Sequence, residues 1–249
     1  PPSTARAAAR RTSWVAADVL NPVGAAFLAG RAALRLGSGR VYLGLLDPQA
    51  PTIDPVQPEL MLRQPAALLA VGLTALACGP GMGGGEVALG LLERACALDL
   101  PLLLDADALN LLATESRLQR VLAERRQRPS PLLLTPHPSE AARLLGADTS
   151  VVQADRGAAA LELASRYQAL VVLKGCGSIV ATPDGRWFVN TTGNPGLAAA
   201  GTGDVLSGLV VALLAQGWPA LEGLLAAVHL HGLAADERVA AGCGPVGLT

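Results

Sequence analysis

The chain has 249 residues, a formal net charge of −1, 51% hydrophobic residues and 16% charged residues. This composition excludes an intrinsically disordered chain and fits one large domain or two small ones. Basic residues form no extended block and no apolar run is long enough to span a bilayer, so we expect neither a nucleic-acid nor a membrane partner.

The N-terminal segment, residues 1–20, is rich in alanine and arginine and has no acidic residue before Asp18. We expect it to be a linker or the remnant of a longer chain, and we expect one folded domain over residues 21–249. That domain begins with a predicted helix over residues 21–37. Asn21 is its expected N-cap, Pro22 lies in its first turn and Gly37 ends it.

Apolar strands and helices then alternate along the chain. We predict strands at residues 41–46, 73–78, 101–105, 131–135 and 170–174, with helices at 86–98, 138–146 and 154–167. A hairpin is expected over residues 178–190 because Pro183, Asp184 and Gly185 form a turn signal, and helices are expected on both sides of Pro219. Continuous apolar strands alternating with helices indicate an α/β fold with a mostly parallel sheet.

Four unusual loops follow predicted strands: GPGMGGG (79–85), DADALN (105–110), TPHPSE (135–140) and KGCGS (174–178). In parallel α/β sheets, ligands bind beyond the carboxyl ends of the strands. The four loops therefore predict one shared site.

The segment AGTGDVLSG (200–208) joins glycines to the start of an apolar helix. Gly201, Thr202 and Gly203 predict an anion site, because free backbone N–H groups and the helix dipole attract phosphate. Asp204 has two interpretations. It complements the helix dipole, or it accepts a proton from a hydroxyl that attacks the phosphate.

The other loops are less specific. Lys174 and the glycines after it either hold a nucleotide or leave a solvated lysine at a strand end, and residues 79–85 either receive a second anionic group or form a tight turn. His137 lies between two prolines that restrict its backbone. We expect Glu140 in the first turn of the next helix, Asp105 as a polar anchor and Asp107 as a helix cap.

Cysteine and histidine usage gives no sign of a metal site built from protein ligands. The four cysteines form no CxxC pair, which favours reduced thiols and a cytoplasmic location. His229 and His231 are two residues apart and would point to different faces of a helix. A lysine, an acid and anion-binding loops without a nucleophilic triad favour phosphoryl transfer from a nucleotide.

The motifs ACGPGMG, LLLDADALNLL, LLTPHPSEAARLLG, LKGCGSIVATPDG and GNPGLAAAGTGDVLSG occur in the order found in the NAD(P)H-hydrate dehydratase family, which the chain resembles from about Gly24 to Thr249. The resemblance implies a ribokinase-like three-layer α/β/α sandwich with a mostly parallel central sheet. It implies repair of hydrated NADH and NADPH (NADHX and NADPHX) with ADP or ATP as co-substrate and Mg2+ as cofactor. It also implies a homotetramer and, in bacterial members, fusion to an epimerase domain.

The resemblance assigns roles to individual residues. Asp204 would be the catalytic base and contact the hydrated substrate, which Ala25, Gly81, His137 and Asn194 would also bind. The nucleotide would be bound by a larger set: Lys174, Gly175, Cys176, Gly177, Ser178, Gly201, Thr202 and Gly203. Two alternatives stay open: a small-molecule kinase of the hydroxyethylthiazole or pyridoxal type, which shares the GTGD element, and a nucleotide-binding module without activity.

Overall fold

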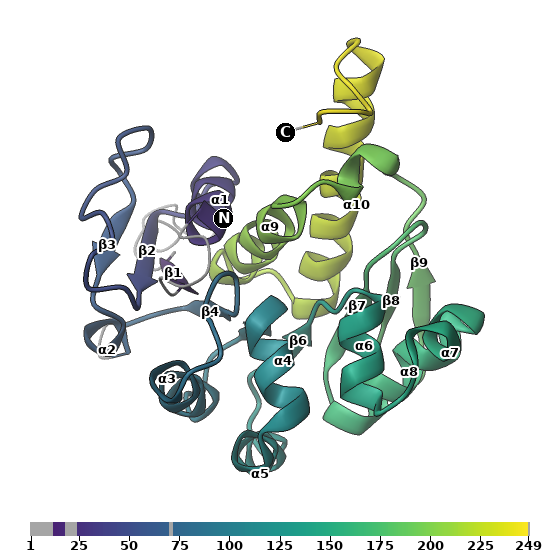
Figure 1. The fold of residues 1–249 in the computed structure, drawn as a ribbon, viewed down its shortest axis with the longest axis horizontal. Coiled ribbons are helices and arrows are strands. Elements are labelled where there is room, and N and C mark those ends of the chain that lie inside the picture. The colour runs from purple at the N-terminus through teal and green to yellow at the C-terminus, as the bar shows by residue number, and fades with distance from the viewer. Residues whose placement is uncertain (1–11, 18–23, 70–71, 249) are drawn as a thin grey trace, which may run out of the picture.

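The computed structural model describes residues 12–17, 24–69 and 72–248 and is shown in Figure 1. Within them, nine strands form one sheet in the order β3-β2-β1-β4-β5-β6-β7-β8-β9. The strands are β1 (Thr12–Ala17), β2 (Arg40–Leu45), β3 (Met61–Arg63), β4 (Ala75–Cys78), β5 (Leu102–Leu104), β6 (Leu132–Leu134), β7 (Leu170–Leu173), β8 (Ile179–Ala181) and β9 (Trp187–Val189). Strands β1 to β7 pair in parallel, and only the hairpin β8–β9 adds antiparallel pairs.

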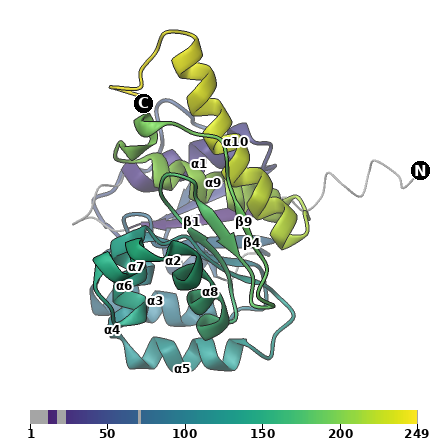
Figure 2. The ribbon, with the colours of Figure 1, turned by 90° about the vertical axis from the view of Figure 1, so that its right-hand side faces the viewer.

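Helices cover both faces of this sheet. They are α1 (Gly24–Arg35), α2 (Pro65–Leu68), α3 (Glu86–Cys96), α4 (Ala106–Thr114), α5 (Ser116–Arg125), α6 (Pro138–Leu145), α7 (Thr149–Ala154), α8 (Arg156–Tyr167), the 3-10 turn η1 (Pro195–Ala198), α9 (Thr202–Ala215) and α10 (Ala220–Ala240). Figure 2 shows α1, α9 and α10 on one side of the sheet and α2 to α8 on the other. The predicted mostly parallel α/β/α sandwich is confirmed.

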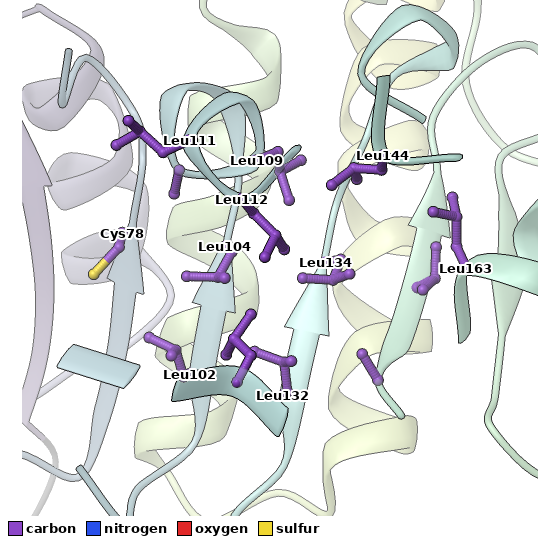
Figure 3. Packing of buried hydrophobic residues seen from close by; sticks show 14 of the residues in the cluster. Cys78, Leu102, Leu104, Leu109, Leu111, Leu112, Leu132, Leu134, Leu144 and Leu163 are labelled. Atoms are coloured by element: carbon purple, nitrogen blue, oxygen red, sulfur yellow. The ribbon is translucent and has the colours of Figure 1, made fainter. Parts of the chain in front are cut away.

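Strand side chains divide between the two layers because successive residues of a strand point to opposite faces. In β5 the outer residues Leu102 and Leu104 pack with the α2–α8 layer, as Figure 3 shows. The central residue, Leu103, packs with α1, α9 and α10. All three leucines are fully buried, which explains why the strands read as continuous apolar runs.

The expected linker over residues 1–20 is wrong for part of its length. Thr12–Ala17 form β1, which pairs in parallel with both β2 and β4 and so lies inside the sheet. The remaining residues of that segment, and the expected capping residues Asn21 and Pro22, lie outside the described residues.

Two further differences concern helix boundaries. The helix predicted over residues 154–167 begins at Arg156, because the Asp155 carboxylate accepts a hydrogen bond from the Ala158 N–H at 2.9 Å and caps a new helix. The short elements β3 and α2 and the helices α5 and α7 were not predicted. None of the described helices is both long enough and apolar enough to cross a membrane.

Helices α1 and α9 approach each other closely at a glycine. A Cβ atom at Gly208 would overlap the carbonyl oxygen of Ala29 in α1 and touch the Ala32 methyl group. Ala29 and Gly208 are both buried. The small residues therefore let α9 pack directly on the α1 backbone, and this contact fixes where the first turn of α9 stands relative to the sheet.

Candidate active site

A buried carboxylate joins three segments at the carboxyl end of the sheet. Asp105 directly follows β5 and is 1% exposed. One of its oxygens lies 2.8 Å from Lys174 Nζ at the end of β7, and the other accepts a hydrogen bond from Ser207 Oγ in α9 at 2.7 Å. The predicted polar anchor is confirmed, and its partners come from 69 and 102 residues further along the chain.

Lys174 lies among acidic groups. Its Nζ is 3.9 Å from a Glu140 oxygen in addition to the Asp105 contact. Burial alone would lower the pKa of Lys174, but Asp105 and Glu140 outweigh it, so the pKa is raised and the amine stays charged. A Cβ on Gly203 would lie 3.4 Å from Nζ, which puts the lysine beside the glycine turn at the start of α9.

His137 is held by the helix that follows it. Its Nδ1 accepts hydrogen bonds from the N–H groups of Ser139 and Glu140 at 3.2 and 3.3 Å, and the Glu140 carboxylate accepts the His137 N–H at 2.7 Å, which forms a capping box. The remaining ring nitrogen, Nε2, therefore carries the proton of the neutral ring and lies 3.3 Å from Glu140. Burial and the charge of Lys174 lower the pKa of His137.

The first turn of α9 carries the predicted acid. Gly201 has φ +88°, a conformation that favours glycine, and directly precedes the helix. Burial and the charge of Asp105 raise the pKa of Asp204 to about 6, although Lys174 lowers it in part. A carboxylate with this pKa near the start of a helix is suited to accept a proton near neutral pH.

A cavity of about 400 Å³ opens beside this turn. Seven of the residues predicted to bind nucleotide line it: Lys174, Gly175, Cys176, Gly177, Ser178, Thr202 and Gly203. It is also lined by apolar residues of η1, α9 and α10 (Pro195, Leu197, Ala198, Leu206 and Val228) and by further polar residues, among them Asn190, Thr192 and His231. Gly201 and Asp204 are not among the lining residues; they lie next to them in the same turn. The cavity lining thus combines polar and apolar residues.

The loop after β7 is shaped by two contacts. Ser178 Oγ donates to the Gly175 carbonyl oxygen at 3.1 Å and so closes the turn. Arg156, the first residue of α8, donates to the carbonyl oxygens of Leu173 and Cys176 at 3.2 and 2.6 Å. Because the Arg156 guanidinium bonds to two backbone carbonyl oxygens of this segment, it holds the loop in its observed conformation.

Sequence reasoning missed the wall that α10 contributes. His231 lines the cavity, and burial lowers its pKa to about 4, so its ring is neutral there. Asp236 accepts hydrogen bonds from the Gly193 N–H at 2.7 Å and from Asn194 Nδ2 at 2.9 Å, which anchors the loop before η1. The segment HLHGLAAD (229–236) carries both residues, but the sequence does not show which other segments they contact.

The GPGMGGG loop is a tight turn. The Met82 N–H donates to the Gly79 carbonyl oxygen at 3.0 Å, and Met82 is fully buried. The Gly83 N–H donates to the Asp107 carboxylate at 2.9 Å. The expectation that Asp107 caps α4 is wrong, since Asp105 holds the N-cap position. The Asp107 carboxylate also disfavours a second anionic group at Gly83.

The residues assigned to the hydrated substrate lie at different places. Gly81, in the turn after β4, and Ala25, in the first turn of α1, are both buried. His137 is close enough to Lys174 and Asp105 for their charges to act on its ring. Asn194 lines the cavity with the nucleotide set, and its side-chain oxygen is occupied by the Gly196 N–H at 3.0 Å.

Among the described residues, no group of three or more histidine, cysteine, aspartate or glutamate side chains is arranged to hold a metal ion. Asp105 is occupied by Lys174 and Ser207. The described residues therefore provide no dedicated cage for a cation.

Comparison with known protein families gives a match over residues 19–243 to the family described as NAD(P)H-hydrate dehydratase. The ADP-dependent (S)-NAD(P)H-hydrate dehydratase of Neisseria meningitidis is 43% identical over 217 residues, which cover 86% of this chain and 72% of that protein. The chain also matches bifunctional NAD(P)H-hydrate repair enzymes, of which it spans less than half the length.

Solved structures give the same result. The ADP/ATP-dependent NAD(P)H-hydrate dehydratase of Bacillus subtilis, co-crystallised with ATP and Mg2+, has a TM-score of 0.84 and 32% identity and covers all of this chain and 87% of its own. A ribokinase-like superfamily protein of Enterococcus faecalis has a TM-score of 0.80 at 24% identity, with coverage of 96% and 83%. The latter match supports the ribokinase-like fold.

Proposed function

Since the chain belongs to the NAD(P)H-hydrate dehydratase family, we propose that it removes water from hydrated NADH and NADPH and couples this step to cleavage of ADP or ATP. One observation carries the proposal. A carboxylate with a pKa of about 6, Asp204, lies in a glycine-started helix turn beside Lys174 and a cavity of about 400 Å³. This arrangement brings a base, a cation and backbone N–H groups to one place.

The nucleotide occupies the cavity with its ends facing different walls. Its base lies against the apolar residues of η1 and α10, and its phosphates lie beside residues 174–178 and the start of α9, all of which contribute to the lining. The free N–H groups of α9 bind the terminal phosphate, because a helix start carries partial positive charge. Lys174 adds a full positive charge beside Gly203.

The hydrated dinucleotide approaches from the other side of Asp204. Its ring hydroxyl faces the Asp204 carboxylate, and the rest of the molecule follows the edge of the sheet toward Gly81 and His137, with Ala25 at the α1 side. His137, held by its capping box, presents the Nε2–H as a donor. The charge of Asp107, which binds the turn containing Gly83, also acts on Asp204, which supports this proximity.

The reaction then proceeds by proton removal, phosphoryl transfer and elimination. Asp204 takes the proton of the ring hydroxyl, and the hydroxyl oxygen attacks the terminal phosphorus of the nucleotide. The rest of the nucleotide is the leaving group, AMP when ADP is used and ADP when ATP is used. The ring-nitrogen electron pair expels the new phosphate ester as inorganic phosphate. Loss of a proton from the adjacent ring carbon restores the double bond of NADH or NADPH.

Mg2+ belongs to this proposal as a partner of the nucleotide. The ion commonly keeps several waters and binds substrate phosphates with one or two carboxylates. That mode fits a site without a three-ligand cluster among the described residues. Bound there, it would neutralise phosphate charge next to Asp204, which lies in the turn that receives the phosphates.

The activity is tested with hydrated NADH, ADP or ATP, and Mg2+. We expect the absorbance of reduced nicotinamide to return, with one inorganic phosphate released per molecule repaired. A phosphorylated vitamin precursor without this return would favour the small-molecule kinase. Nucleotide binding without turnover of any hydrate would favour a module without activity.

The pH dependence of turnover follows from Asp204. Its pKa of about 6 means that the acid form, which cannot accept a proton, predominates below pH 6. We expect kcat at saturating nucleotide to fall about tenfold per pH unit below pH 6 and to level off above it. The pH dependence of ADP binding is measured separately, because the terminal phosphate titrates in the same range. A kcat that stays constant from pH 5 to pH 8 would remove the base assignment.

Gly203→Ala tests the phosphate position. The added methyl group would lie 3.4 Å from Lys174 Nζ, in the space between the lysine and the helix start. We expect KM for the nucleotide to rise about tenfold, because a phosphate could no longer approach the backbone closely. Gly84→Ala is the matched control, since a Cβ there meets no atom within 4 Å. An unchanged nucleotide KM in Gly203→Ala would contradict the placement.

We propose a homotetramer, a cytoplasmic location and, in the full-length protein, an accompanying epimerase domain. The last is supported by the bifunctional repair enzymes that the chain matches over less than half of their length. Light scattering of the purified protein tests the tetramer.

A further inference from the structure

We propose that Asp105 is a positioning residue that ties the lysine end of β7 to the start of α9 and so holds Asp204 in register with the transferable phosphate. This inference rests on the function proposed above. Asp105 itself does not need to touch either substrate. Its two oxygens are already used, one by Lys174 Nζ at 2.8 Å and one by Ser207 Oγ at 2.7 Å.

The first argument is the geometry of the Lys174–Asp105–Ser207 bridge. Ser207 is three residues after Asp204, so both side chains lie on the same face of α9, one turn apart. Ser207 is completely buried, and its hydroxyl is bonded to Asp105. An apolar residue would fill this position equally well if it served only to pack the helix. The hydroxyl instead fixes the rotation of α9 relative to the end of β5.

The second argument is the backbone that carries Asp105. The Asp105 N–H donates to the Cys78 carbonyl oxygen at 3.0 Å, and a Cβ on Gly79 would overlap the Asp105 carbonyl oxygen. The next residue, Ala106, has φ +47°, a left-handed conformation that is unfavourable for a residue with a Cβ atom. Such strain persists only where the surrounding structure enforces it. The chain therefore fixes Asp105 more tightly than a helix start alone requires.

The third argument is electrostatic. The charged groups that act on Asp204 are Asp105 at the end of β5, Lys174 at the end of β7 and Asp107 in α4. Asp105 holds the lysine and also repels the Asp204 carboxylate. Without the Asp105 charge, the repulsion disappears and Lys174 is freed to approach Asp204, so both changes lower the pKa of Asp204.

Asp105→Asn and Ser207→Ala test the inference, with Ser165→Ala as the control because Ser165 is exposed on α8. We expect kcat to fall roughly 10- to 100-fold in Asp105→Asn and less in Ser207→Ala, since small displacements of reacting groups cost rates of this order. The acid limb of the kcat profile should move to lower pH in Asp105→Asn only, because Ser207→Ala keeps the carboxylate. A purely structural role would not move this limb.

Hydrogen exchange of residues 205–209 gives a readout that does not depend on turnover. We expect faster exchange there in both variants than in the wild type, and no change in Ser165→Ala. A folded Asp105→Asn protein with wild-type kcat and an unmoved acid limb would overturn the inference. If Asp105→Asn does not fold, the test rests on Ser207→Ala. Wild-type kcat or unchanged exchange of residues 205–209 in that variant would overturn the inference. A wild-type protein without repair activity would refute the proposed function. Hydrogen exchange would then still test whether the contacts of Asp105 with Lys174 and Ser207 hold the start of α9 in place.

Discussion

Asp204→Asn is expected to lower kcat for hydrate repair by about 10³-fold while nucleotide binding is kept. The amide has nearly the same shape as the carboxylate but cannot accept the hydroxyl proton, and a general base commonly contributes 10²- to 10⁴-fold. Because the negative charge beside the phosphates is removed, ADP should bind at least as tightly as to the wild type. Measuring kcat in the repair assay and ADP affinity by calorimetry separates the effect on turnover from the effect on nucleotide binding.

The control for this prediction is Asp99→Asn. Asp99 is an exposed acid that precedes β5, at the opposite end of that strand from Asp105. Its removal should leave kcat within a factor of two of the wild type, as is usual for surface substitutions. Near-normal turnover in Asp204→Asn would require a different base and would leave Asp204 as a complement to the helix dipole.

Gly208→Ala is expected to destabilise the fold by about 3 kcal/mol. The new methyl group would overlap the Ala29 carbonyl oxygen, which belongs to the α1 backbone and cannot move as a side-chain end can. Overpacking of this kind typically costs 1 to 3 kcal/mol and occasionally more. Urea unfolding measures the loss, and kcat should fall too, since α9 carries Asp204 in the turn before.

Gly90→Ala provides the matched comparison. Gly90 also lies inside a helix, α3, but a Cβ there meets no atom within 4 Å. Alanine is the better helix former by up to about 1 kcal/mol, so this variant should be as stable as the wild type or more stable. Equal stability of Gly208→Ala and Gly90→Ala would contradict the close contact between Gly208 and the α1 backbone.

Much of the fold was predictable because its signals are local. Apolar strands ending in glycine, proline or aspartate marked β4 to β7, and residues 183–185 marked the β8–β9 hairpin. The first strand was missed because TSWVAA follows an alanine- and arginine-rich stretch and has no turn signal beside it. Its place between β2 and β4 depends on pairing with distant strands.

The site was predictable in its parts and not in its connections. Loop glycines, Lys174 and Asp204 carry chemistry that a sequence displays directly. Ser207 reads as a small residue in an apolar helix, and only the folded chain shows its bond to Asp105. His231 and Asp236 were missed for the same reason, since their partners lie in other segments.

The separation of 102 residues between Asp105 and Ser207 has a consequence for biosynthesis. At about 5 to 20 residues per second, a ribosome needs roughly 5 to 20 s to make the serine after the aspartate has been added. Lys174 is added 69 residues after the aspartate, so for about the first two thirds of that interval the carboxylate has neither of its native partners. The nascent protein therefore keeps this acid hydrated at least until Lys174 has been synthesised, and the second contact waits for Ser207.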